Sequence, residues 1–265
     1  MKRNRWIHLS LVAAAAALAA CSDTTTPAAT VVTDAQLNAD VAQTSGDAIA
    51  SDVGEMVASE AFAGMPAPPA FDVLSPPGVT VNRSRTCYGG GVVQAACNAT
   101  TTDSVVITMT MDGSFSNTNT TPHGTESMNV TLHRARQLTI SGLAGTESSR
   151  NHNGVGSGSD TTVFSGTTDG ASRTRTLTTA GTDSVQSVVF NLPHASNPWP
   201  VSGKIVRNVS GKVVVTGGPN PGERTFTRRI EVDFPADAQG NVTIHINDKT
   251  CNANLVTRVV SGCTT

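Results

Sequence analysis

The chain has 265 residues and a formal net charge of −2 at pH 7, with 18 lysine and arginine residues against 20 aspartate and glutamate residues. This balance offers no basic surface for a phosphate backbone, so no nucleic-acid partner is expected. Aromatic residues make up only 4 % of the chain, which argues against a platform of stacked rings for sugars or bases. Abundant threonine and valine favour β-strands.

The first twenty residues have the composition of an export signal. Lys2, Arg3 and Arg5 precede a mostly apolar run over residues 6–20. This run is too short to cross a bilayer as a helix, but it fits the apolar part of a secretory signal peptide. It ends in Leu-Ala-Ala, directly before Cys21.

This ending resembles the lipobox of bacterial lipoproteins, in which the cysteine is lipidated and becomes the mature N-terminus. The resemblance implies that residues 1–20 are removed and that Cys21 carries a lipid anchor, so the protein is tethered to a membrane of the cell envelope. Ser22 follows Cys21, a pattern that usually permits transfer to the outer membrane in Gram-negative lipoproteins. The alternative is an ordinary signal peptide with a coincidental cysteine.

Composition divides the rest of the chain into four parts. Residues 21–33 are small and polar and predict a flexible tether. Residues 34–64 have helical periodicity. Residues 65–78 are rich in proline, which is typical of a semi-rigid connector. Residues 79–265 alternate apolar and polar side chains and predict a β domain.

The helical segment begins at Thr33 or Asp34, whose side-chain oxygens can cap the first turn. Apolar residues recur at helical spacing as far as residue 62. Gly46 and Gly54 weaken a helix by about 1 kcal/mol each relative to alanine. One broken helix or two short helices are therefore expected over 34–62.

Period-two alternation runs through the β domain. Val105, Ile107 and Met109 share one strand face, for example, and turn residues separate such stretches. The expected fold is mainly β: an antiparallel β-sheet, sandwich or open barrel, with the short helical segment packed on its apolar face or covering an open end. Residues 147–160 lack alternation of this kind and predict a long polar loop.

Four cysteines follow Cys21, and an even number in an exported chain indicates disulfides. Local pairing of Cys87 with Cys97 and of Cys251 with Cys263 is favoured among three connectivities. The rival interpretation is a zinc site, but these spacings differ from the close ligand pairs of structural zinc sites. No metal is expected.

The sequence contains no recognised catalytic motif and no cofactor-binding motif. No two of the histidines after Cys21 have the spacing of a ligand pair on one strand or helix, and solvated or hydrogen-bonded histidines are expected. Catalytic residues and cofactors are therefore both predicted to be absent.

Arginines on otherwise apolar strand faces are an unusual feature of this sequence. Arg134 and Arg136 share the otherwise apolar face of one strand, and Arg173 and Arg175 share a face with Leu177. These four arginines could line a groove for an anionic group. The alternative is that they lie near strand ends, where the stem packs on the sheet and the charged head reaches water.

Three functions are compatible with this pattern. The first is a non-enzymatic cell-envelope lipoprotein that binds or scaffolds a partner. The second is a carrier of lipid or another hydrophobic ligand, which would need an apolar cavity. The third is a hydrolase with an unrecognised site. The first is the main expectation, with the ligand or protein partner unknown.

Overall fold

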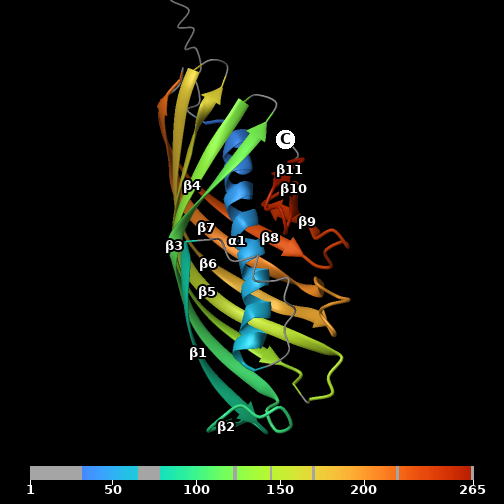
Figure 1. Cartoon of the computed structure of the whole chain (residues 1–265). Coiled ribbons are helices and arrows are strands. Elements are labelled where there is room, and N and C mark those ends of the chain that lie inside the picture. The colour runs from blue at the N-terminus through green and yellow to red at the C-terminus, as the bar shows by residue number, and fades with distance from the viewer. Residues whose placement is uncertain are drawn as a thin grey trace, which may run out of the picture.

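The computed structural model describes residues 32–64, 78–121, 124–143, 145–168, 171–218 and 221–263. One long helix lies inside a strongly curved antiparallel sheet, which wraps around it (Figure 1). This arrangement confirms the expected mainly β fold with an N-terminal helix packed against the sheet. The predicted signal peptide, Cys21, most of the tether and nearly all of the proline-rich connector lie outside the described residues.

Across the described ranges, eleven antiparallel strands form one open sheet, in the order β11-β10-β9-β8-β7-β6-β5-β4-β3-β1-β2. From β3 to β11, each strand pairs with its neighbours in the sequence, so the chain meanders through the sheet. The strands are β1 (Val79–Gly89), β2 (Val92–Gln94), β3 (Ser104–Thr121), β4 (Gly124–Ser141), β5 (Ser149–Thr168), β6 (Ala171–Asn191), β7 (Pro200–Gly217), β8 (Gly222–Asp233), β9 (Asn241–Ile246), β10 (Lys249–Asn254) and β11 (Val260–Ser261).

The helix α1 (Asp34–Phe62) is continuous over 29 residues. Thr33 caps its first turn, because its hydroxyl accepts a hydrogen bond from the Gln36 backbone N–H at 3.1 Å. The expected break at the glycines is wrong. Every residue from Thr44 to Val57 is buried, so tertiary packing on all sides outweighs the low helix propensity of glycine.

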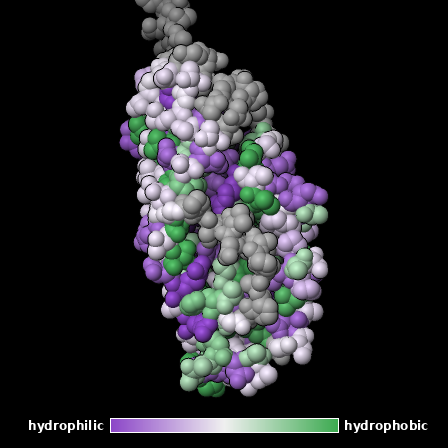
Figure 2. Space-filling view, in the orientation of Figure 1, coloured by the Kyte–Doolittle hydropathy of each residue, from purple (hydrophilic) through white to green (hydrophobic). Residues whose placement is uncertain are grey.

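The predicted alternation is confirmed in the strands. In β3, Val105, Ile107 and Met109 are buried against the core, whereas Thr108 between them is exposed. The apolar face of the sheet points inward at α1, and the polar face points outward. Hydrophilic and hydrophobic residues are accordingly mixed over the visible surface, without one dominant apolar area (Figure 2).

The polar loop expected over residues 147–160 is wrong, because most of this stretch belongs to β5, an interior strand of the sheet. Its inward positions include Gly154, Gly156 and Gly158, which lack the apolar side chains that usually reveal a strand. β5 nevertheless pairs with β4 on one side and β6 on the other. Backbone pairing thus defines this strand where side-chain alternation does not.

Two disulfides lie near opposite edges of the sheet. Cys87 in β1 is joined to Cys97, which follows β2. Cys251 in β10 is joined to Cys263, which follows β11. These are the two local pairs that the spacing favours.

Candidate functional site

A charged row crosses the inner face of the sheet beneath α1. The strand register places Arg136 of β4 opposite Gly156 of β5, and Gly156 opposite Asp183 of β6. A β-carbon on Gly156 would lie 2.6 Å from the Asp183 carboxylate. The glycine therefore leaves the space in which Arg136 Nη2 donates a hydrogen bond to Asp183, across β5.

The same arginine ties the helix to the sheet. Arg136 Nη1 lies 2.8 Å from Oδ1 of Asp52, a fully buried residue of α1. Burial alone would lower the pKa of Arg136, but the carboxylates of Asp52 and Asp183 outweigh it and raise that pKa above its usual value. Arg136 thus remains charged in the interior because two carboxylates face it.

Two further buried arginines have carboxylate partners. Arg134 donates to Asp160 of β5 from Nε at 3.2 Å and from Nη2 at 2.8 Å. Arg175 donates to Asp40 of α1 from Nε and Nη2, both at 2.9 Å, and also to Glu126 of β4. The arginines of the inner face thus pair with carboxylates from α1 and from nearby strands.

A second cluster surrounds Glu60 in the last turns of α1. His194 Nε2 lies 2.7 Å from Glu60 Oε2, and His152 Nε2 lies 3.1 Å from Oε1. Arg150 Nη1 donates to Oε2 as well. Phe190 packs against both imidazoles, with ring centroids 5.2 Å from His152 and 5.4 Å from His194.

Burial by itself would raise the pKa of Glu60, but His152 and His194 outweigh it and lower that pKa to about 2. The Glu60 cluster, composed of Glu60, His152, His194 and Arg150, therefore holds a buried carboxylate in its charged form. It fastens the C-terminal part of α1 to β5 and to the segment that follows β6.

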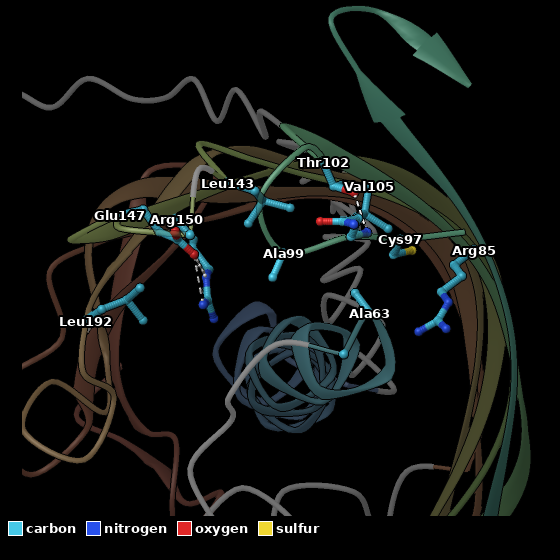
Figure 3. A pocket seen from close by; sticks show the side chains of 13 residues that line it. Ala63, Arg85, Cys97, Ala99, Thr102, Val105, Leu143, Glu147, Arg150 and Leu192 are labelled. Carbon is cyan, nitrogen blue, oxygen red and sulfur yellow. Dashed lines mark hydrogen bonds and ion pairs between the residues drawn. The ribbon is translucent and has the colours of Figure 1, made fainter. Parts of the chain in front are cut away.

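A pocket of about 420 Å³ lies next to this cluster, at the C-terminal end of α1. Figure 3 looks along the helix and shows lining side chains around its end, with Arg85 on one side and Glu147 and Arg150 on the other. The lining residues that the structure describes are Ala63, Gly64, Arg85, Cys97, Asn98, Ala99, Thr102, Val105, Leu143, Gly145, Glu147, Arg150 and Leu192.

The charged residues of this pocket differ in how they are paired. Arg150 donates to Glu147 Oε1 from Nε at 3.2 Å and from Nη2 at 3.0 Å, and it also contacts Glu60. Arg85 instead donates to the Phe62 backbone carbonyl and stacks over the Phe62 ring. Among the described residues, no carboxylate forms an ion pair with Arg85.

The predicted anion-groove residues lie elsewhere. Arg134, Arg136 and Arg175 are buried under α1, and Arg173 is half-buried farther along β6. None of the four lines the pocket at the end of α1. The alternative, that these arginine heads reach water near strand ends, is wrong for the three buried side chains.

Sequence reasoning missed the Glu60 cluster. Glu60 is 90 residues from Arg150 and 134 residues from His194, so no local motif connects them. An isolated acid near the end of a helix was the only available signal. Within the described part of the chain, no group of three or more histidine, cysteine, aspartate or glutamate side chains is arranged to hold a metal ion.

Comparisons with protein-family models, with curated proteins and with solved structures find no match for this chain. No helix in the described ranges combines the length and the apolar character needed to cross a membrane.

Proposed function

We propose that this protein is a lipid-anchored lipoprotein of the cell envelope whose β domain is a non-enzymatic binding module. The pocket at the end of α1 is its ligand site. The observation that carries the proposal is the cavity of about 420 Å³, which has the size of small-molecule sites in proteins. Among the described residues, its wall combines apolar side chains with two neutral polar ones, Asn98 and Thr102, and three charged ones, Arg85, Glu147 and Arg150.

The proposed location is supported by two features. The lipobox-like sequence ends at Cys21, and the two disulfides are typical of proteins in oxidising compartments. Export followed by lipidation would place the pocket in the envelope, within reach of small apolar molecules there.

The non-enzymatic role is supported by the pairing of the nearby ionisable groups. Arg150 and Glu147 are hydrogen-bonded to each other in the pocket wall. Glu60 is held charged by two histidines, with a pKa of about 2. A group with such a low pKa is poorly suited to accept a proton near neutral pH.

A carrier of lipid or another hydrophobic ligand is the second candidate, and the aliphatic side chains in the pocket wall favour it. The inner face of the sheet is itself occupied by α1 (Figure 1). A carried molecule would therefore use the pocket at the helix end. Binding and carrying differ in whether the ligand is passed on to an acceptor, which a transfer assay between donor and acceptor vesicles measures.

Native mass spectrometry of the mature chain from Ser22 onward tests the ligand site, because this chain contains every residue that the structure describes. We expect an added mass that disappears on organic extraction. Ala63→Phe places a ring in the pocket and should abolish the added mass. Ala61→Phe, at an exposed position on the same helix end, should retain it. Retention of the ligand by both variants would contradict the assigned site.

Metabolic labelling with an alkyne fatty acid tests the anchor. The full-length chain should incorporate the label and sediment with membranes. Cys21→Ala should lose the label and become soluble after export. Equal labelling of both chains, or no labelling of the unmodified chain, would remove the lipoprotein assignment.

A further inference from the structure

Arg85 is the one charged residue of the pocket lining that pairs with no carboxylate among the described residues. It is exposed, so it lies where the pocket meets solvent. A guanidinium carries five N–H donors, and the hydrogen bond to the Phe62 carbonyl uses one of its nitrogens. Donors therefore remain for a ligand at this end of the pocket.

The rest of the pocket differs from this rim. Val105 and Leu143 contribute buried aliphatic side chains to the lining, and Ala63 adds a methyl group from the helix end. An apolar chain inserted here would lose contact with water, which is favourable by about 25 cal/mol per Å² of apolar surface buried. The pocket thus offers aliphatic side chains beside a cationic rim, with Thr102 and the Arg150–Glu147 pair also in its wall.

The charge at the rim of the pocket limits the charge that the head group of a ligand can carry. Arg85 offers one positive charge without a carboxylate partner among the described residues, whereas Glu147 is paired with Arg150, and the carbonyl end of α1 adds negative potential near the pocket. A monoanion is therefore better matched than a dianion. A carboxylate also has the geometry that a guanidinium fork recognises with two parallel hydrogen bonds.

We infer that the pocket binds a single-chain amphiphile with a carboxylate head, held by Arg85 at the rim with its apolar chain directed inward. This inference rests on the proposed function and adds the chemical class of the ligand.

Three probes with the same chain and different heads test it: dodecanoate, dodecanol and dodecylamine. Each is titrated below its aggregation concentration into the mature chain at pH 7 by calorimetry. We expect dodecanoate to bind about tenfold more tightly than dodecanol, because one charge-assisted hydrogen bond contributes about this much to the affinity. Dodecylamine should bind most weakly. Arg85→Gln should remove the preference for dodecanoate and leave the affinity for dodecanol unchanged.

Arg229→Gln is the matched control, because Arg229 is an exposed arginine of β8 that does not line the pocket. It should keep the preference for dodecanoate. Equal binding of the three probes, or a preference that survives Arg85→Gln, would overturn the inference while the proposed function stands. Failure of the folded unmodified chain to bind any probe would also overturn the inference, whereas the proposed ligand site is overturned only if native mass spectrometry finds no added mass.

Discussion

Buried charges replace part of the apolar contact between α1 and the sheet. Asp40, Asp52 and Glu60 come from the helix, and each faces a buried cation on the sheet. Taking such groups out of water costs several kcal/mol per ion, so pairing offsets a penalty more than it adds stability. Loss of one partner is therefore more harmful than loss of a whole cluster.

The Arg136 triad tests this asymmetry. Arg136→Met leaves the carboxylates of Asp52 and Asp183 buried without their cation, and we expect a loss of about 3–5 kcal/mol in the free energy of unfolding. Urea denaturation measures it. The triple variant Asp52→Leu/Arg136→Met/Asp183→Leu should recover most of the loss. A triple variant less stable than Arg136→Met would show that the charges themselves stabilise the fold.

Asp47 links stability to pH. Burial, only partly offset by Arg258 and Gln43, raises the pKa of Asp47 from 3.8 to about 6. The folded state therefore holds this proton more tightly than the unfolded state does. The corresponding stability is present below pH 3.8 and is lost as the pH rises through 6.

Asp47→Asn should remove this loss. The variant should gain stability over the unmodified chain as the pH rises from about 4 to 6, by up to about 3 kcal/mol. Denaturation at several pH values measures the difference. A pH-independent difference for Asp47→Asn would contradict this assignment.

Glu60→Gln should behave in the opposite way. This variant should be less stable than the unmodified chain at pH 7, and its deficit in the free energy of unfolding should shrink as the pH falls below about 4.5.

At the scale of elements, α1 behaves as part of the core rather than as a surface helix. Its midpoint passes close to the C-terminal strands, where a β-carbon on Gly46 would lie 2.6 Å from Val260 Cγ2 and 3.7 Å from Ile244 Cδ1. Close packing therefore favours glycine at position 46, although glycine disfavours helix formation.

Gly46→Ala should consequently fail to stabilise the protein. In an exposed helix this change gains about 1 kcal/mol, but overpacking here should cost about 1–3 kcal/mol. A double-mutant cycle with Val260→Ala isolates the contact. The cost of Gly46→Ala should be smaller when Val260 is already alanine, as measured by urea denaturation. Equal costs in both backgrounds would mean that the helix shifts to accommodate the methyl group.

At the scale of the molecule, the two disulfides anchor opposite ends of a long meandering sheet. They close chain segments of 10 and 12 residues. Of the four bridged cysteines, only Cys97, from the first pair, lines the pocket at the end of α1. The two bridges should therefore have similar effects on stability and different effects on binding.

Removal of either bridge, by Cys87→Ala/Cys97→Ala or by Cys251→Ala/Cys263→Ala, should lower the free energy of unfolding by about 3 kcal/mol. Only the first double variant should weaken dodecanol binding, because it alters the pocket wall. Urea denaturation and calorimetry report the two effects separately. Weakened binding in the second variant would indicate that the pocket depends on the far edge of the sheet.

The sequence by itself determined the mainly β class, the start of the helix at Thr33 or Asp34 and the inward face of strands such as β3. These features depend on local patterns, because side chains alternate along a strand with period two. The spacing of the cysteines likewise favours the two local bridges. None of these inferences requires knowledge of which strands become neighbours.

Only the tertiary structure decided the partners of the buried charges and the position of the pocket. Arg136 forms an ion pair with Asp183, 47 residues away in the sequence, because β5, which lies between them, has glycine at the inward position. Glycine at the inward positions of β5 hides that strand from pattern analysis and also makes room for the ion pair. Such long-range complementarity leaves no period in the sequence, since it is created when the sheet curves around α1.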